Sequence, residues 1–348
     1  MQLKKLLTVL GTVGIVASLA ACSSMNTTKK TFVPVTTSPQ YLTDSTPRLG
    51  IIAAFGQEAD LLLASMTDKK DYLIRGKKFT TGQLENKAVV ITLSGISMTN
   101  AAMTTQLLSD HFQVKGLVFS GIAGSLNPNY HVGDVVIAKG WMAPNEIYFA
   151  NTTDLPSACG SAGDVSCLGL ALDQSIPPYQ QQFFRQTNVI NAANYQNVAL
   201  TTKIGDQNIP VAYGEMKSSF AVDANMWNIA NTIHSNIPLE AICSDKNNCY
   251  QPKIVMGQRG ISSGSFLANA KYRDYLHTTM QGDYVDMETA AVAQVAYAND
   301  IPFIAFRSLS DLAGADHDPN VAAFFGSGVA QRNAAKLTIG FVKEWNIR

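Results

Sequence analysis

Residues 285–314 read V-D-M-E-T-A-A-V-A-Q-V-A-Y-A-N-D-I-P-F-I-A-F-R-S-L-S-D-L-A-G, a stretch that joins a helical pattern to a strand pattern. Residues 287–297 are rich in Ala and Val at helical spacing, which predicts a helix buried on most sides. Residues 302–306 are apolar without a polar face, as is typical of a strand in a parallel sheet covered on both sides. Because the helix runs back against the strand, its first turn and the end of the strand should lie at the same edge of the sheet.

That edge carries several polar side chains. Asp286 and Glu288 stand at the start of the predicted helix, and Ser310 and Asp311 follow the predicted strand. Open α/β sheets bind ligands at this edge, so two acidic groups are expected to meet over a pocket. Each acid also has a simpler interpretation, as an N-cap or as a complement to the helix dipole. Arg307 should have a carboxylate partner nearby, because an unpaired charge at the end of an apolar strand would be costly.

The composition indicates a globular chain with a sizeable core. Of 348 residues, 46% are hydrophobic and 15% charged, so the chain could fold as one large α/β domain or two small ones. The 26 basic and 26 acidic residues give a formal net charge of zero, without a long block of one sign. Phosphate binding along a nucleic acid needs a basic surface, so nucleic acid is not expected to be the main partner.

The first residues predict export and lipid attachment. Residues 1–21 combine a positively charged start with an apolar run too short for a comfortable membrane span, which is typical of a signal peptide. The sequence L-A-A-C at 19–22 matches the bacterial lipoprotein signal, so Cys22 is expected to become a lipid-modified N-terminus. Ser23 is typical of lipoproteins of the outer membrane, and residues 22–46 should form a flexible tether on the periplasmic side. The alternative is an ordinary secreted protein in which this cysteine occurs by chance.

The four remaining cysteines form two close pairs in loops rich in polar residues and glycine. Exported proteins can form disulfides, and local bridges are the simplest connectivity, although two other pairings stay open. A zinc site is disfavoured, because neither pair has the two-residue spacing of a zinc knuckle and no His lies close to either. The expected local bridges are Cys159 with Cys167 and Cys243 with Cys249.

The rest of the chain alternates strand and helix patterns, which predicts a largely parallel α/β sheet. The middle, residues 140–253, is the least periodic region and is interpreted as a long insertion with a helix over residues 221–231. We therefore predict a single three-layer domain over residues 47–348, with a mixed, largely parallel central sheet flanked by helices. The expected strands cover residues 49–55, 78–81, 87–93, 116–120 and 135–138, and the expected helices cover residues 56–66, 99–112 and 321–344.

Three glycine-bearing loops follow apolar strands and could approach a ligand closely: residues 94–97, 120–124 and 262–266. None fits the dinucleotide-binding or Walker pattern, so a nucleotide phosphate site is not indicated. A glycine after a strand is usually only part of a turn, so each loop alone is weak evidence. Judged by itself, Phe266 is expected to belong to the core rather than to stack on a base.

Together with the acidic residues, these loops resemble the nucleoside phosphorylase/nucleosidase superfamily. The closest branches are the methylthioadenosine/S-adenosylhomocysteine nucleosidases and the plant bark-storage-like proteins. The motifs occur in the same order as in the family and cover nearly the whole folded part except the middle insertion. The resemblance also implies a homo-oligomer. The motifs that carry it are G-I-I-A-A-F-G-Q-E at 50–58, L-S-G-I-S-M-T-N-A-A at 93–102, F-S-G-I-A-G-S-L-N-P at 119–128, V-G-D-V-V at 132–136, V-D-M-E-T-A-A at 285–291 and F-R-S-L-S-D-L-A at 306–313.

The resemblance implies a role for each matching residue. Asp311 would protonate or hydrogen-bond N7 of a purine, which makes the base a better leaving group. Glu288 would accept hydrogen bonds from the ribose hydroxyls, with Met287 packed against the sugar. Phe266 would stack on the base, and the backbone at Leu267 would read the edge of the base. The other expected substrate-binding residues are Ser94, Gly124, Ser310 and Arg307, of which the last two would orient Asp311.

Hydrolysis and phosphorolysis differ on the other side of the sugar. Glu58 stands where the nucleosidases of this superfamily carry the general base that activates water. The phosphorylases place an arginine in this loop and another just before the central glycine loop, whereas here the first loop lacks Arg and the second position is Phe119. An oxyanion without arginine partners would be poorly bound, so water is the expected nucleophile. Ile122 departs from the family, which usually has Ser there and hence one more hydroxyl near the nucleophile.

The expected function is therefore that of a lipoprotein nucleosidase, without metal or redox cofactor, that cleaves purine nucleosides such as methylthioadenosine, S-adenosylhomocysteine, adenosine or inosine to base and sugar. Two alternatives stay open. One is a phosphorylase whose phosphate contacts come from a neighbouring subunit or the insertion, and the other is a non-catalytic nucleoside-binding lipoprotein. Asp316, His317 and Asp318 are interpreted as a solvated loop rather than a metal site, because three adjacent residues rarely converge on one ion.

Overall fold

The computed structural model describes residues 42–144, 187–189, 201–204, 207–210, 215–245, 248–314 and 326–346. The predictions for Cys22, for most of the tether, for the Cys159–Cys167 pair and for residues 316–318 lie outside this part of the chain. No helix in the described part has both the length and the apolar character that a membrane span requires.

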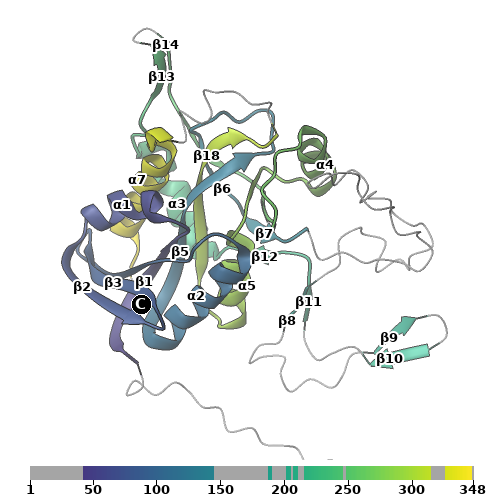
Figure 1. Ribbon diagram of the computed structural model, residues 1–348, viewed down its shortest axis with the longest axis horizontal. Helices are drawn as coiled ribbons and strands as arrows, with labels where there is room; N and C mark the ends of the chain where they lie inside the picture. Colours follow the sequence, from purple (N-terminus) through teal and green to yellow (C-terminus); the bar gives the residue numbers. More distant parts are fainter. Residues whose placement is uncertain are drawn as a thin grey trace, which may run out of the picture. The chain divides into compact units, whose positions relative to one another are not determined.

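Twelve of the described strands form one mixed sheet (Figure 1). Their order is β12-β7-β16-β17-β5-β1-β4-β3-β2, with β18 paired to both β5 and β6 and with β15 paired to β6. The strands are β1 (Asp44–Ala53), β2 (Thr67–Ile74), β3 (Lys77–Leu84), β4 (Lys87–Leu93), β5 (Phe112–Ser125), β6 (Val135–Ile137), β7 (Gly140–Met142), β12 (Phe220–Ala221), β15 (Ile254–Met256), β16 (Arg259–Ser262), β17 (Tyr284–Asp286) and β18 (Phe303–Leu312).

The centre of the sheet is parallel, and antiparallel pairs lie around it. β1 runs parallel to β4 and β5, and β5 runs parallel to β18. β2, β3 and β4 form an antiparallel edge, and β17 joins the end of β5 in the antiparallel sense. Central parallel strands are buried on both faces, which explains the continuous apolar runs that predicted them.

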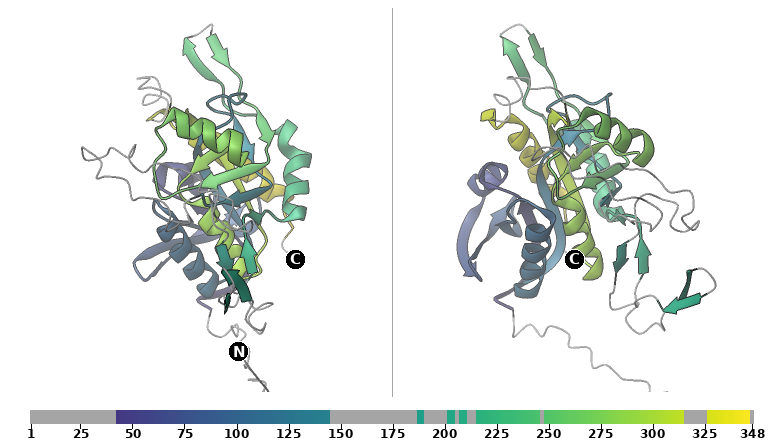
Figure 2. Two further views of the ribbon diagram at one scale, coloured as in Figure 1. Left: turned by 90° about the vertical axis from the view of Figure 1, so that its right-hand side faces the viewer. Right: turned by 45° about the vertical axis from the view of Figure 1, so that its right-hand side comes forward.

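Helices cover both faces of the sheet, so the predicted three-layer arrangement is confirmed (Figure 1, Figure 2). Phe303 and Ala305 of β18 pack in one hydrophobic cluster with α2 and α5, whereas Ile304 and Phe306 pack in a second cluster with α1, α3 and α7. This alternation follows from the opposite directions of successive side chains in a strand. The helices are α1 (Gly56–Ala64), α2 (Met98–His111), α3 (Ala224–Ile233), α4 (Ala270–Met280), α5 (Thr289–Ala298) and α7 (Val329–Glu344).

Two element boundaries near the acidic residues differ from the prediction. β18 continues to Leu312, so that Arg307, Ser310 and Asp311 lie within the strand instead of at its end or after it. The sequence did not predict this part of the strand because its residues are polar. They are buried all the same, since they have partners that the sequence pattern does not show. α5 begins at Thr289, and Glu288 is its N-cap residue.

The N-terminal edge of the domain also differs. β1 begins at Asp44, inside the segment predicted as a tether, and β2 was not predicted at all. β2 lies at the edge of the sheet and is rich in exposed charged residues, so it lacks the apolar pattern by which strands are recognised.

The predicted insertion, residues 140–253, contains parts of the main fold at both of its ends. β7 and β12 belong to the large sheet, and α3, which the sequence placed at residues 221–231, covers one of its faces. Strands of two or three residues are too short to show a periodic pattern, which is why these ends were assigned to the insertion. Between them, β8 (Thr187–Val189) pairs with β11 (Glu215–Lys217), and β9 (Thr201–Ile204) pairs with β10 (Gln207–Pro210).

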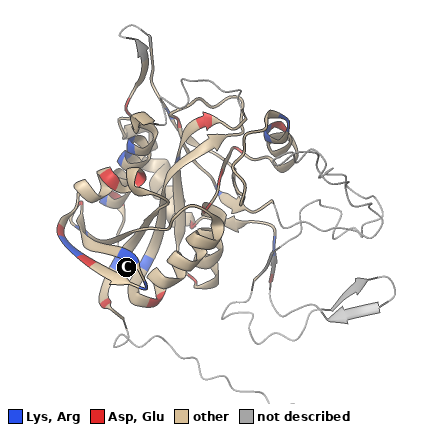
Figure 3. Ribbon diagram, viewed as in Figure 1, with Lys and Arg blue, Asp and Glu red and all other residues tan. Residues whose placement is uncertain are grey.

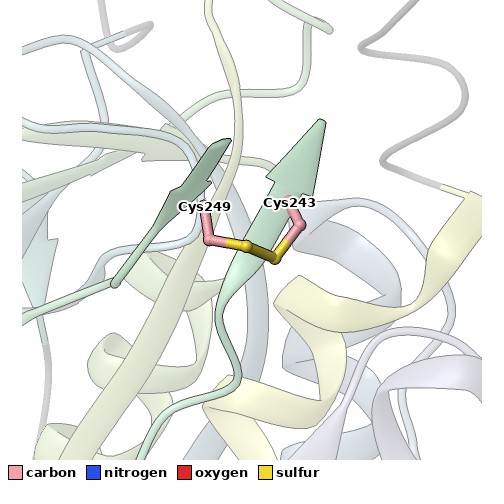
Figure 4. Close-up of a disulfide and its surroundings, with 2 residues drawn as sticks. All are labelled: Cys243 and Cys249. Atoms are coloured by element: carbon pink, nitrogen blue, oxygen red, sulfur yellow. A yellow bond between two sulfur atoms is a disulfide. The ribbon is translucent and has the colours of Figure 1, made fainter. Parts of the chain in front are cut away.

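One of the two predicted disulfides lies in the described part and is confirmed. Cys243 and Cys249 are bonded to each other across a hairpin of β13 (Ile242–Asp245) and β14 (Asn248–Tyr250) (Figure 4).

Candidate active site

A pocket lies at the carboxyl ends of β1, β5, β16, β17 and β18, the edge at which the sequence placed the acidic residues. Its empty volume is about 650 Å³, with the open mouth included. Of the residues predicted to act on or bind a substrate, those that line the pocket are Glu58, Gly124, Phe266, Leu267, Met287, Glu288, Ser310 and Asp311.

Asp311 reaches the pocket because of a β-bulge. β18 pairs with β5 residue by residue as far as Leu309, and the register then resumes at Asp311 opposite Gly124, which leaves Ser310 as the extra residue. The Ser310 hydroxyl donates to Asp311 Oδ2 over 2.7 Å, the contact that the expected orienting role of Ser310 requires. A Cβ atom on Gly124 would lie 2.9 Å from Asp311 Oδ1, so a side chain at this position would displace the carboxyl.

The environment of Asp311 favours its protonated form. Burial raises the pKa of this carboxyl above its ordinary value, and the hydrogen bond from Ser310 opposes the shift only in part. A carboxyl that stays protonated to higher pH can donate a proton to a leaving group.

Glu58 lies in the first turn of α1 and is 1% exposed. Its Oε1 accepts a hydrogen bond from the Ile122 backbone N–H at 2.8 Å, and its Oε2 accepts from the backbone N–H groups of Ala54 at 2.6 Å and Phe55 at 3.4 Å. Burial raises the pKa of Glu58, while Arg307 and these N–H groups lower it. The carboxylate is therefore held in one orientation at the pocket wall, where it can act as a base toward a bound molecule.

Arg307 is fully buried behind the pocket and contacts three carboxylates. Its Nη2 lies 2.6 Å from Asp286 Oδ2 and 3.4 Å from Glu288 Oε2, and its Nη1 lies 3.6 Å from Glu58 Oε1. Its guanidinium carbon also lies 4.1 Å from the centroid of the Phe119 ring. The prediction that Arg307 has a carboxylate partner is thus confirmed, and the structure shows three such partners.

The resemblance implies that Arg307 binds substrate and orients Asp311, and that role stays a prediction. Arg307 does not line the pocket, and its ion pairs go to the other acidic residues. Arg307 lies within β18, four residues before Asp311, whose carboxyl accepts a hydrogen bond from Ser310. Arg307 instead fixes Glu58 and Glu288, which do line the pocket.

Glu288 is bonded to the glycine loop at residues 94–97. Its Oε1 accepts a hydrogen bond from the Ser97 backbone N–H at 3.0 Å. Burial, and next the nearby charge of Asp286, raise its pKa to about 7, while Arg307 acts in the opposite direction. Ser94, which the resemblance implies as a substrate-binding residue, is fully buried, and its hydroxyl donates to the Gly95 carbonyl at 2.8 Å; its binding role stays a prediction. The loop at residues 94–97 contributes to the site in two ways: the Ser97 backbone N–H donates to Glu288, and the Ile96 side chain lines the pocket.

Phe266 lies at the mouth of the pocket and is 75% exposed, so the expectation that it belongs to the core is wrong. The role that the resemblance implies, a face on which a flat base can stack, agrees with this position. Ile96, 54% exposed, is a second apolar side chain at the mouth.

Sequence reasoning placed Asp286 at this edge of the sheet but gave no role to three other residues that build the site, Thr289, Ser262 and Gly121. Asp286 is the closest partner of Arg307, and the Thr289 hydroxyl donates to Asp286 while it accepts from Arg307 Nη2 at 2.8 Å. The Ser262 hydroxyl donates to the other Asp286 oxygen. A Cβ atom on Gly121 would collide with both Arg307 and Glu58. The position of Arg307 at the end of an apolar strand predicted a carboxylate partner. The spacing of the acidic residues in the sequence does not show which of them approach it.

The charges of the described residues do not indicate a metal or a polyanion as the ligand. No group of His, Cys, Asp and Glu in the described part is arranged to hold a metal ion. Basic and acidic residues lie next to each other along β2 (Figure 3), and α4 and α7 each carry residues of both signs.

Comparison with known proteins gives consistent matches. The family model of the phosphorylase superfamily matches residues 48–343. A 5'-methylthioadenosine/S-adenosylhomocysteine nucleosidase of Mycobacterium bovis is 27% identical over 282 residues, which are 81% of this chain and 92% of that protein. The enzyme of the same name from Staphylococcus carnosus is 25% identical, over 85% of this chain and 99% of its own.

Solved structures show the same fold. The 5'-methylthioadenosine/S-adenosylhomocysteine nucleosidase of Neisseria meningitidis, in complex with methylthio-immucillin-A, matches with a TM-score of 0.57 at 21% identity, over 87% of this chain and all of that one. The futalosine hydrolase of Helicobacter pylori matches with the same TM-score at 18% identity, over 88% of this chain and all of that one.

Proposed function

Since the chain belongs to the phosphorylase superfamily, we propose that it hydrolyses the N-glycosidic bond of purine nucleosides to a free base and a free ribose sugar. One observation carries the proposal: an acid, Asp311, and a base, Glu58, line one pocket, and none of the described residues that line it is Lys, Arg or His. A phosphate nucleophile would meet carboxylates there without a cation to bind it, whereas water needs only the base.

On the side of the purine, Asp311 donates its proton to N7 as the bond between N9 and C1′ breaks. The electron pair of that bond passes to the purine, and the new N7–H bond lets the purine leave as a neutral molecule. Burial raises the pKa of Asp311, which keeps the proton available. Phe266 and Leu267 line the same pocket as Asp311. They would hold the base in the orientation that the proton transfer needs.

On the side of the sugar, C1′ gains positive charge as the purine leaves. Glu288 accepts hydrogen bonds from ribose hydroxyls, and its negative charge stabilises the cationic sugar. Glu58 takes a proton from the water that attacks C1′, and the oxygen of this water becomes the new hydroxyl of the ribose. Its three backbone hydrogen bonds keep the Glu58 carboxylate in place for this step.

The names of the relatives support a purine nucleoside as the substrate. Nucleosidases for methylthioadenosine and S-adenosylhomocysteine resemble this chain most consistently, and a futalosine hydrolase shares the fold. We propose methylthioadenosine, S-adenosylhomocysteine, adenosine and inosine as the substrates to compare first, in a role of nucleoside scavenging.

Incubation of the purified protein with each nucleoside, with and without phosphate, tests this function. Free base and free sugar are both measured. We expect base and unphosphorylated ribose to appear in phosphate-free buffer. Release that requires phosphate and gives ribose 1-phosphate would contradict hydrolysis, and release from no nucleoside by a protein that still binds purines would favour a binding protein.

Replacing Phe266 by alanine is expected to raise KM about tenfold and to leave kcat nearly unchanged, because base stacking contributes about 1–3 kcal/mol and is the same before and during the reaction. Steady-state kinetics measure both constants. Leu73→Ala is the control, since Leu73 is 77% exposed on β2 and does not line the pocket. A fall in kcat without a change in KM would contradict the stacking role.

We propose in addition that a lipid on Cys22 holds the protein at the bacterial cell envelope, with the domain facing the periplasm and acting as a homo-oligomer. The sequence pattern L-A-A-C at 19–22 supports the anchor, and the family supports the oligomer. Cys22→Ala should move the protein from the membrane fraction to the soluble fraction of cells. An unchanged membrane fraction would contradict the lipid anchor.

A further inference from the structure

The disulfide hairpin of β13 and β14 contacts a loop that holds β18 beside the active site. From these contacts, and building on the proposed hydrolysis, we infer that Asp134 and Tyr250 are positioning residues for Asp311, and that the Cys243–Cys249 disulfide keeps Tyr250 in place.

Asp134 is buried and is the centre of this connection. Its Oδ1 accepts hydrogen bonds from the Tyr250 hydroxyl at 2.7 Å and from the Lys253 backbone N–H at 2.8 Å. Its Oδ2 accepts from the His131 backbone N–H at 2.9 Å. Three donors from two segments of the chain therefore fix the carboxylate, and with it the turn at residues 131–134.

The backbone of this turn is bonded directly to β18. The Gly133 N–H donates to the Leu309 carbonyl at 2.7 Å, and the Leu309 N–H donates to the Asp134 carbonyl at 2.8 Å. The Ser308 hydroxyl donates to the Gly133 carbonyl at 3.3 Å. These bonds hold one edge of β18 while β5 holds the other.

The bulge that aims Asp311 begins immediately after Leu309. Ser310 is the unpaired residue of the bulge, and Asp311 is the first residue to pair with β5 again. A bulge keeps its direction only if the residues around it are held. The turn at residues 131–134 holds the residue before the bulge on the side that β5 does not reach, so it sets the direction in which Asp311 enters the pocket.

The disulfide joins the two strands of the hairpin that carries Tyr250. Cys243 pairs with Cys249 across the two strands, and the neighbouring pair is Ile242 with Tyr250 (Figure 4). Ile242 fills the space beside Gly133 that a Cβ atom would occupy, and the Tyr250 ring lies 4.9 Å from the His131 ring. Both cysteines are exposed, so the covalent bond compensates for a hairpin with little buried apolar surface of its own.

Tyr250→Phe tests the connection, because it removes the hydroxyl that bonds Asp134 and keeps the ring. We expect kcat for nucleoside hydrolysis to fall about tenfold with KM nearly unchanged, since a small displacement of a catalytic group affects the chemical step more than binding. Tyr297→Phe is the matched control: its hydroxyl donates to the Glu215 carboxylate and Tyr297 does not line the pocket, so kcat should stay at the wild-type value. The thermal midpoint of each variant shows whether it is folded.

The double variant Tyr250→Phe/Ser310→Ala separates positioning from a purely structural role. Both hydroxyls act on Asp311, so the loss in kcat of the double variant should be smaller than the product of the two single losses. A loss equal to that product, or a wild-type kcat in Tyr250→Phe, would overturn the role of Tyr250.

Reduction of the protein tests the disulfide. We expect a phosphine reductant to lower kcat to the level of Tyr250→Phe, and the double variant Cys243→Ser/Cys249→Ser to show the same kcat with and without reductant. That variant controls for effects on the other cysteines. A reduced wild-type protein with full kcat would overturn the role of the disulfide. If the oxidised wild type hydrolyses no nucleoside, the proposed function itself fails, which is a separate result.

Discussion

Replacing Asp311 by asparagine is expected to lower kcat for nucleoside hydrolysis about 10²- to 10⁴-fold, the range that positioned general acids contribute. The amide has nearly the same shape as the carboxyl and can still accept the hydrogen bond from Ser310, but it cannot give a proton to N7 of the purine. Binding of the nucleoside should stay largely intact, because the change removes an interaction that matters in the transition state.

The measurement combines steady-state kinetics with calorimetric titration of a nucleoside or the free base. Asp71→Asn is the control, since Asp71 is an exposed residue of β2 outside the pocket, and its kcat should be unchanged. Unchanged turnover in Asp311→Asn would contradict the mechanism. Loss of binding together with turnover would show instead that Asp311 acts in holding the substrate.

The pH dependence of kcat gives a second test of the same residue. Asp311 acts in its protonated form, so kcat of the wild type should fall as the pH rises through the pKa of Asp311 in the complex. Burial raises this pKa, which moves the fall toward higher pH than an exposed aspartate would allow. The residual activity of Asp311→Asn should lack this limb of the profile.

The layers of the fold could be predicted because buried segments leave a clear pattern. The Ala-rich α5 and the apolar β1 are covered on both sides, so their composition alone indicates a helix and a strand inside an α/β sheet. The end of β18 has no such pattern. Ser308 and Ser310 are buried with hydrogen bonds to the carbonyls of Gly133 and Ala123, and a buried serine with a partner cannot be told from a loop serine by sequence.

The identity of the acidic residues could be predicted, but their partners could not. Glu58, Asp286 and Arg307 are far apart in the sequence and meet only because the first turn of α1, the end of β17 and the second half of β18 lie at the same edge of the sheet. The need for glycine at position 121 could not be predicted either. It arises because Glu58 and Arg307 occupy the space that a side chain would fill. The cost of an unpaired buried charge predicts a partner for Arg307. The three carboxylates that pair with it are known only from the structure.

Replacing Arg307 by methionine is expected to lower the free energy of unfolding by about 3–5 kcal/mol at pH 8, as removal of one partner of a buried ion pair does. Methionine fills much of the space of the side chain but leaves Glu58, Asp286 and Glu288 close together without a cation. Urea unfolding with the disulfide intact measures the difference. Arg332→Met is the control, because its ion pair with Glu240 is partly exposed and should contribute only about 0–1 kcal/mol.

The sign of the pH dependence distinguishes repulsion among buried carboxylates from a simple loss of packing. Burial raises the pKa of Glu58 and brings that of Glu288 from its ordinary value near 4.5 to about 7, and Arg307 lowers both. Between the unfolded and the folded pKa, the folded protein binds more protons, so its stability falls as the pH rises through this window. Without Arg307 both pKa values rise further, so Arg307→Met should lose more stability relative to the wild type at pH 8 than at pH 5. An equal loss at both pH values would indicate lost packing and contradict the electrostatic role of Arg307.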